Sequence, residues 1–229
     1  MFIGHYGVSL AAKRFAPRAP LGALFLGAQL LDVLFATFVL AGVENLRIVP
    51  GFTKMNPYDL YSMPYSHSLV GAVLWSALSA FAFGALMKKT IPGAKERMSS
   101  ALVFAIVVFS HFALDVPMHT PDLPIGFGPD AAKVGFGMWN QPDVAVVMEL
   151  GVLVAGGALY LGSTRAKAGG ETAMRITAVV LLVLAVVTPF MPPPGSAAAF
   201  AAQALAAYAA LAVLAEWMDR KRVPIPPVL

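Results

Sequence analysis

Six apolar stretches, each long enough to cross a membrane as a helix, constrain the fold of this 229-residue chain more than any other feature. A helix needs about 20 apolar residues to cross the roughly 30 Å hydrocarbon core of a bilayer. The stretches are residues 21–43, 67–87, 99–118, 142–162, 172–191 and 196–217. They predict an all-α fold, namely a polytopic membrane bundle of six transmembrane helices.

The composition agrees with a membrane protein. Apolar residues make up 59% of the chain and charged residues 12%, whereas soluble domains have about 45–50% and about 25%. This excludes a disordered chain, a secreted mini-protein and an ordinary cytosolic enzyme. The absence of cysteine excludes disulfides, thiolate metal sites, iron–sulfur clusters and a cysteine nucleophile.

Most basic residues lie in short clusters in alternate connecting segments. These clusters contain Lys13, Arg14, Arg18, Lys88, Lys89, Lys95, Arg97, Arg165, Lys167, Arg175, Arg220, Lys221 and Arg222. Since membrane proteins keep such clusters on the cytoplasmic side, we expect a cytoplasmic C-terminus, with the first, third and fifth loops outside. The distribution of Lys and Arg therefore orients the helices and accounts for the net charge of +4, and no nucleic-acid partner is expected.

The first sixteen residues are apolar but too short for a span. Lys13 and Arg14 follow the apolar part instead of preceding it, which argues against a cleavable signal peptide. Two interpretations remain: an amphipathic helix on the inner membrane surface, or a short helix that dips into the bundle. In either case Pro17 and Pro20 make the turn into the first span.

Ionisable residues inside the apolar stretches are the candidate functional groups. Such a group costs about 2.5–3.5 kcal/mol on insertion, so each needs a partner or a function. Asp32 lies in the middle of the first stretch, and His67 begins the second. In the third stretch His111 and Asp115 are four residues apart, so they share a helix face and can bind one ion together.

The depths of these residues indicate that they can meet. At 1.5 Å per residue, Asp32, His111 and Asp115 lie about 16, 18 and 24 Å from the inner edge, and His67 enters from the outer edge. The Pro17–Pro20 turn is midway between His5 and Asp32, so a helical hairpin sets these two side by side. This favours the dipping helix and predicts five metal ligands in the outer half of the membrane: His5, Asp32, His67, His111 and Asp115.

A purely structural role remains the alternative for each residue taken singly, such as an Asp hydrogen-bonded to Gln29 or an interfacial His67. A purely structural role for all five together is disfavoured. Interhelical hydrogen bonds in membranes average about 0.6 kcal/mol, which is too little to offset several buried charges. A divalent cation offsets the buried charges better. His119 and Asp122 are weaker candidates, Asp122 being expected in a solvated loop. Glu149 is a candidate general base, or else a protonated acid bonded to another helix.

The remainder of the chain is expected to be structural. We predict one membrane domain over residues 1–229, with the metal-site half in residues 1–120 and structural helices in residues 142–217. Alanine in the last stretch, and Gly151, Gly156 and Gly157 in the fourth, predict close helix packing. No internal repeat is found, and the tail over residues 224–229 is expected to be non-helical.

The order of these residues resembles the membrane-bound metal-dependent hydrolase family, of the LexA-regulated inner-membrane type. The similarity covers about residues 1–120: a His near the N-terminus, Asp32, Ser-His-Ser at 66–68 and Ser-His-x-x-x-Asp at 110–115. It also looks like part of the zinc-dependent phospholipase C ligand set. The family's His-Arg pair before a Thr-His-Ser is absent, since Tyr61, Ser62 and Met63 occupy that stretch and Ser66 replaces the Thr.

The resemblance implies that His67, His111, Asp32 and Asp115 hold one ion, and that His5 and the shared Asp115 help hold another. The expected ion is zinc, with manganese or iron as alternatives. The expected activity is hydrolysis of a phosphoester of a lipid or amphiphile near the outer leaflet of a bacterial inner membrane. Metal-activated water is the nucleophile, and Asp115, Asp32 and Glu149 are the catalytic candidates. A proton- or metal-coupled transporter that uses the same cluster, and a silent scaffold, are the alternatives.

Overall fold

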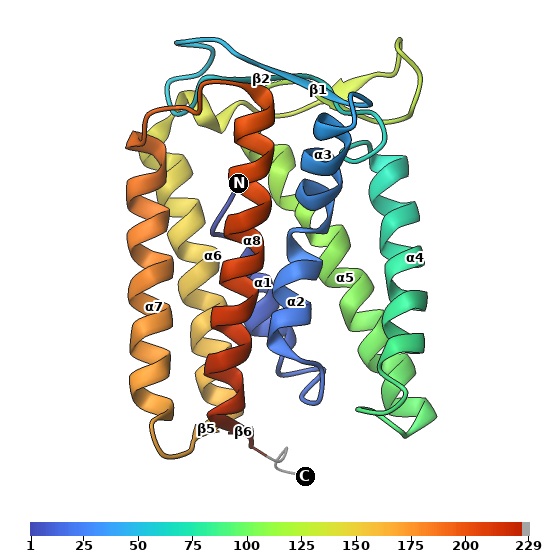
Figure 1. The fold of residues 1–229 in the computed structure, drawn as a ribbon, viewed down its shortest axis with the longest axis vertical. Coiled ribbons are helices and arrows are strands. Elements are labelled where there is room, and N and C mark those ends of the chain that lie inside the picture. Colours follow the sequence, from blue (N-terminus) through green and yellow to red (C-terminus); the bar gives the residue numbers. More distant parts are fainter. Residues whose placement is uncertain (226–229) are drawn as a thin grey trace.

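Long apolar segments become helices in a membrane because a helix satisfies its own backbone hydrogen bonds. A computed structural model describes residues 1–225 of the chain, in which long helices lie side by side (Figure 1). Five of them are long and apolar enough to span a membrane. They are α4 (Leu69–Leu86), α5 (Ala94–Met118), α6 (Pro142–Ser163), α7 (Gly170–Val187) and α8 (Ala197–Arg220). Apolar side chains cover their outward faces, among them Phe81, Val154, Val183 and Val213.

The first predicted span is broken, so the expectation of one continuous helix over residues 21–43 is wrong. It consists of α2 (Leu21–Ala28) and α3 (Leu30–Leu40), which are bent by 59° at Gln29. Gln29 is fully buried, and its side-chain amide donates to the Phe2 carbonyl at 2.9 Å. Gln29 itself has non-helical backbone angles (φ −103°, ψ 10°) between the two helices. The pair can form a sixth span if it is counted as one.

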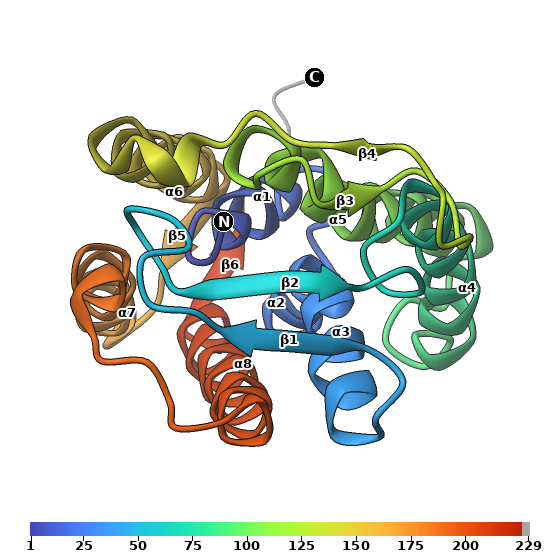
Figure 2. The ribbon, with the colours of Figure 1, turned by 90° about the horizontal axis from the view of Figure 1, so that it is seen from above.

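The N-terminal helix α1 (His5–Ala12) lies inside the bundle, not on its surface (Figure 2). Tyr6 and Leu10 are buried, and Lys13 after the helix pairs with Asp219 of α8 at 2.5 Å. The helix approaches α6 so closely that a Cβ atom on Gly156 would overlap the backbone of Gly7. The predicted packing role of Gly156 is therefore confirmed.

The other two glycines of the fourth stretch do not share that role. A Cβ atom on Gly151 or Gly157 would meet nothing within 4 Å, so the close packing expected there is wrong. Both residues lie on parts of α6 that face away from α1. Position on the helix, and not residue type alone, decides which small residue brings two helices together.

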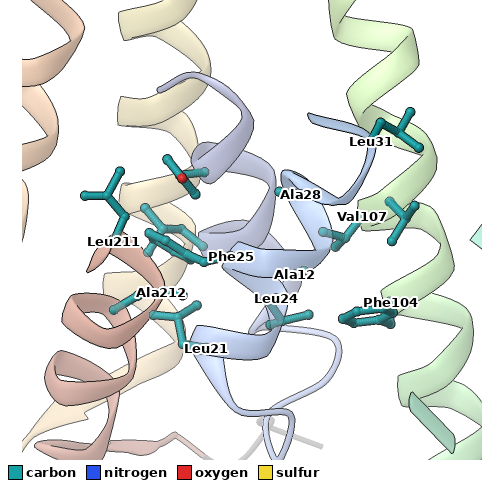
Figure 3. Packing of buried hydrophobic residues seen from close by; sticks show 14 of the residues in the cluster. Ala12, Leu21, Leu24, Phe25, Ala28, Leu31, Phe104, Val107, Leu211 and Ala212 are labelled. Atoms are coloured by element: carbon teal, nitrogen blue, oxygen red, sulfur yellow. The ribbon is translucent and has the colours of Figure 1, made fainter. Parts of the chain in front are cut away.

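Helix α2 packs at the centre of the bundle, between α5 and α8 (Figure 3). Leu24 points toward Phe104 and Val107 of α5, while Leu21 lies beside Ala212 of α8. All five are buried. This packing fixes the position of the bend after α2, and hence the position of Asp32 in α3.

The two ends of the bundle differ. One end carries the basic segments and the short pair β5 (Thr164–Ala166) and β6 (Arg222–Pro224). At the other end the antiparallel hairpin of β1 (Asn45–Ile48) and β2 (Tyr58–Ser62) crosses above the helices (Figure 2). The pair β3 (Leu123–Pro124) and β4 (Lys133–Val134) and the 3-10 turns η1 (Met138–Asn140) and η2 (Thr188–Phe190) lie at the same end. The predicted non-helical tail lies, for residues 226–229, outside the described residues.

Candidate metal centre

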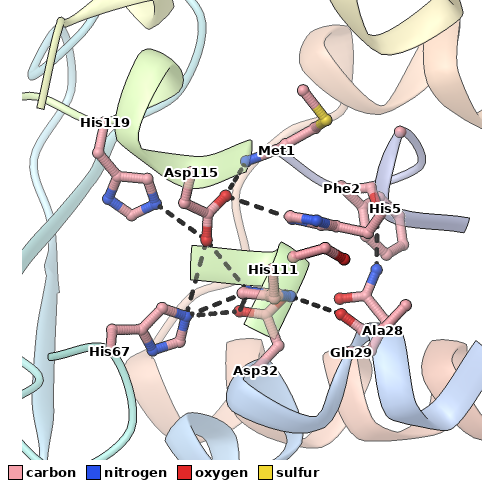
Figure 4. Close-up of polar contacts among 12 residues, drawn as sticks. Met1, Phe2, His5, Ala28, Gln29, Asp32, His67, His111, Asp115 and His119 are labelled. Carbon is pink, nitrogen blue, oxygen red and sulfur yellow. Dashed lines mark hydrogen bonds and ion pairs between the residues drawn. The ribbon is translucent and has the colours of Figure 1, made fainter. Parts of the chain in front are cut away.

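The five predicted ligands meet in the interior of the bundle (Figure 4). His5 comes from α1, Asp32 from α3, His67 from the segment before α4, and His111 and Asp115 from α5. The four residues other than Asp32 are buried, and the Asp32 side chain is 22% exposed. Two overlapping groups have ligand atoms within 4.8 Å of one another: His5, His111 and Asp115, and Asp32, His67 and His111.

The separations between ligand atoms match those around a small metal ion. Nε2 of His67 lies 3.3 Å from His111 Nε2, 3.3 Å from Asp32 Oδ1 and 3.9 Å from Asp115 Oδ2. Nε2 of His111 lies 3.6 Å from Asp32 Oδ1 and 3.1 Å from Asp115 Oδ2. Four ligands placed about 2.0–2.1 Å from a tetrahedral zinc ion are separated by about 3.3–3.4 Å. His67 Nε2, His111 Nε2 and Asp32 Oδ1, which lie 3.3–3.6 Å apart, therefore have the spacing of three corners of a tetrahedral site, and Asp115 Oδ2 lies beside His111.

The two oxygens of Asp115 face different neighbours. Oδ2 faces His67 and His111, while Oδ1 lies 3.2 Å from His5 Nε2 and accepts a hydrogen bond from the Met1 amino group at 2.6 Å. The His5 and His111 rings stack, with their centroids 3.9 Å apart. Asp115 is thus placed to bridge two adjacent positions.

His67 is oriented by a chain of hydrogen bonds through Ser66 to Glu44. Glu44 is fully buried; its Oε2 accepts the Ser66 hydroxyl proton at 2.5 Å, and its Oε1 accepts the N–H groups of Tyr65 and Ser66. Ser66 Oγ also lies 2.8 Å from His67 Nδ1. Because the single hydroxyl proton goes to the carboxylate, Ser66 accepts here and His67 Nδ1 donates. Nε2 of neutral His67 therefore presents a lone pair to the centre.

The same reasoning assigns His111 and His119. His111 Nδ1 lies 2.6 Å from the Ala28 carbonyl oxygen, next to the break between α2 and α3, and His119 Nδ1 lies 2.9 Å from Asp122 Oδ1. A carbonyl and a carboxylate can only accept, so both Nδ1 atoms donate. His119 Nε2 then faces Asp115 Oδ2 at 3.8 Å. Metal-bound histidines usually have their other ring nitrogen tied in this way.

The centre formed by His67, His111, Asp32 and Asp115 is consequently rich in acceptors. The Nε2 atoms of His67 and His111 face each other at 3.3 Å beside two carboxylates, and each carries a lone pair when both rings are neutral. Within the described residues, neither ring nitrogen of His5 has a hydrogen-bond partner, because its Nε2 is close to Asp115 without being aligned for one. Buried acceptors that lack donors are costly. The buried His and Asp groups can hold a metal ion that satisfies them.

Two other predicted residues have different surroundings from those expected. Asp122 is not solvated: it is 8% exposed and bonded to His119 and to the Thr120 hydroxyl, so that expectation is wrong. Both oxygens of Glu149 accept backbone N–H groups, from Phe2 and Gly4, at 3.0 Å. Glu149 thus holds the segment that precedes His5. Its role as a general base stays a prediction.

Sequence reasoning missed two polar contributors. Glu44 follows the first apolar stretch and gives no sign that it reaches Ser66, twenty-two positions further on. Tyr208 lies in an alanine-rich helix expected to be structural, yet its hydroxyl donates to Asp32 Oδ2 at 3.0 Å. The only sequence signal for Tyr208 is a lone phenol among alanines.

A cavity of about 390 Å³ reaches the centre. Asp32, His67, Asp115 and His119 line its polar side. Trp139 of η1 also lines it and packs on the His119 ring, with the centroids 4.2 Å apart. Tyr58 of the hairpin is a further lining residue, and burial raises the pKa of its phenol, which therefore stays neutral. The candidate ligands are thus accessible to a small molecule.

No family model, curated protein or solved structure matches this chain. The helices and the site define its class: a helical membrane protein with a buried His/Asp centre that can hold a metal ion.

Proposed function

We propose that this protein is a membrane-embedded, metal-dependent hydrolase that cleaves a phosphoester of a lipid or amphiphile. The observation that carries the proposal is the buried His/Asp centre, in which the Nε2 atoms of His67 and His111 face each other at 3.3 Å beside Asp32 and Asp115. The cavity beside these ligands supports turnover of a substrate in preference to a purely structural ion. The resemblance to membrane-bound metal-dependent hydrolases supports the reaction class.

In this proposal His67, His111, Asp32 and Asp115 hold one zinc ion, with manganese or iron as alternatives. His5 and the second oxygen of Asp115 help hold another ion. Bound divalent ions supply Lewis acidity and lower the pKa of water. The protein's own groups position these ligands: the Ser66–Glu44 pair fixes His67, and the Ala28 carbonyl fixes His111.

The reaction replaces one bond to phosphorus with another. The oxygen of a water molecule forms a new P–O bond, the ester P–O bond breaks, and the leaving alcohol takes up the proton that water loses. Asp32 is the proposed carrier of that proton, since it lies at the cavity and is only partly buried. Its hydrogen bond from Tyr208 fixes the orientation of the carboxylate.

The proposed topology has six spans, with α2 and α3 counted as one, and α1 dipping into the bundle from the basic end. The positive-inside rule puts the basic end and the C-terminus in the cytoplasm. The metal centre then faces the outer side, and the resemblance favours a bacterial inner membrane.

The test combines metal analysis with turnover. The purified protein is analysed for bound metal by mass spectrometry and assayed on soluble and lipid phosphoesters, before and after chelation and metal return. We expect stoichiometric metal and an activity that follows the metal, and His111→Ala and Asp115→Ala should lose both. Asp143→Asn, an exposed carboxylate at the start of α6, is the matched control and should keep both.

Three results would contradict the proposal. A His111→Ala protein with full metal content would refute the ligand assignment. A metal-replete protein that is inactive across phosphoesters would point to the scaffold alternative, and one that loses its metal readily during purification would favour a transporter.

A further inference from the structure

The cavity continues beyond the metal centre into an apolar space between α7 and α8. Its lining on that side comes from Leu184 and Ala185 of α7 and from Phe200, Ala204 and Ala207 of α8. These α8 residues recur every three or four positions, so they lie on one helix face. The next residue on this face, Tyr208, bonds to Asp32 in the metal centre. One continuous space therefore has a polar end and an apolar arm.

The dimensions of this arm fit the part of a hydrocarbon chain that is nearest the head group. From Phe200 to Tyr208 there are eight residues, or about 12 Å along the helix. The total volume of about 390 Å³ is near the lower end of the range for ligand pockets, which is roughly 300–1,000 Å³. The alanines at 185, 204 and 207 make the space, since larger side chains there would fill it.

The hairpin of β1 and β2 separates this arm from the outer aqueous side. Tyr58 of β2 packs against Phe200 of α8, with ring centroids 4.7 Å apart, and Met55 and Pro57 line the cavity from the same hairpin. Gln203 of α8 and Thr188 at the end of α7 also line the cavity and are exposed. The arm thus reaches the surface of the bundle at α7 and α8.

We infer that the substrate is an amphiphile with a single apolar chain, which lies between α7 and α8 while its phosphoester contacts the His/Asp centre. This inference rests on the proposed function for the chemistry of the head and on the cavity for the chain. Ala185, Ala204 and Ala207 set the chain length that the arm accepts. The substrate reaches the centre sideways from the outer leaflet.

The main experiment narrows the arm and compares two substrates. Ala204→Trp is assayed with a hexadecyl phosphoester in detergent and with a short, soluble phosphoester. We expect kcat/KM for the hexadecyl substrate to fall by about tenfold or more relative to the short one, because a single methylene in an apolar pocket already changes selectivity about 10- to 200-fold. Ala206→Trp is the matched control, because Ala206 is exposed and lines no part of this cavity. It should leave the ratio unchanged.

Equal losses for both substrates in Ala204→Trp, or the same effect in Ala206→Trp, would overturn the inference. If Ala204→Trp does not fold, Ala207→Phe narrows the same arm one turn further in and is judged by the same ratio.

A second measurement does not depend on turnover. A hexadecyl phosphonate with a diazirine in its chain is photolysed with the wild-type protein, and the labelled residues are identified by mass spectrometry. The chain site is supported if residues 184–188 and 200–207 of the wild type are labelled and this labelling decreases in Ala204→Trp. Label confined to outward-facing residues such as Val183 and Val213 overturns it. A wild type that is labelled in the arm but hydrolyses no phosphoester contradicts the proposed function alone.

Discussion

Replacing Ser66 by alanine tests how His67 is held in the metal centre. The hydroxyl lies between Glu44 Oε2 at 2.5 Å and His67 Nδ1 at 2.8 Å, and it is buried. Ser66→Ala leaves Glu44 Oε1 with its two backbone donors, from Tyr65 and Ser66, and removes the hydroxyl donor to Oε2. His67 Nδ1 also loses its partner, and the lone pair on Nε2 is no longer favoured over the other tautomer.

Loss of such a supporting partner typically lowers metal affinity 10- to 100-fold, or about 1.4–2.8 kcal/mol. We therefore expect a rise of this size in the metal dissociation constant of Ser66→Ala, measured by competition with a chromophoric chelator. Ser66→Thr keeps a hydroxyl and should restore most of the affinity.

The control is Ser68→Ala, two residues further on. Ser68 caps the start of α4 by accepting the N–H of Gly71 at 3.0 Å, so its loss should cost about 1 kcal/mol of stability without changing metal affinity. The reasoning is refuted if Ser66→Ala binds metal as tightly as the wild type, or if Ser68→Ala weakens binding equally.

Three further predictions concern stability in detergent, measured by thermal unfolding. Chelation should lower the unfolding temperature of the wild type, because metal at 100 times its dissociation constant contributes about 2.7 kcal/mol; a His111→Ala protein that responds equally would contradict the site. Gly156→Leu should lower the free energy of unfolding by about 1–3 kcal/mol or more, because its side chain would overlap the backbone of α1. A side chain at position 157 would point into open space, so Gly157→Leu should change the stability little. Equal losses in the two variants would argue against this helix contact. Lys13→Met should lower the free energy of unfolding by about 3–5 kcal/mol, because it leaves the Asp219 carboxylate without its buried cation. Exposed ion pairs contribute less than about 1 kcal/mol, so a loss of that size would show that the pair is solvated.

Much of the site could be predicted from local spacing. His111 and Asp115 share a helix face because they are four residues apart, and this geometry holds wherever the helix lies. The turn at Pro17 and Pro20 brings His5 back toward the first span. This prediction needs only the number of residues on each side of the turn. The structure groups His5 with His111 and Asp115 rather than with Asp32, and His5 Nε2 lies 3.2 Å from Asp115 Oδ1.

The features that could not be predicted depend on contacts between distant segments. The bend lies at Gln29, whose side chain bonds to Phe2, and the Ala28 carbonyl beside it accepts the His111 Nδ1 proton. Neither apolar length nor hydropathy signals such a break. Likewise, Glu44 and Tyr208 join the site only because the loop after α3 and the face of α8 pack there.

An experimental structure with anomalous scattering data, collected at the absorption edges of zinc, manganese and iron, would test the central claim most directly. The account predicts an anomalous peak among His67 Nε2, His111 Nε2, Asp32 and Asp115, and a neighbouring peak between Asp115 and His5. A map without any peak at these residues, with the His67 and His111 rings hydrogen-bonded to water or to each other, would contradict it.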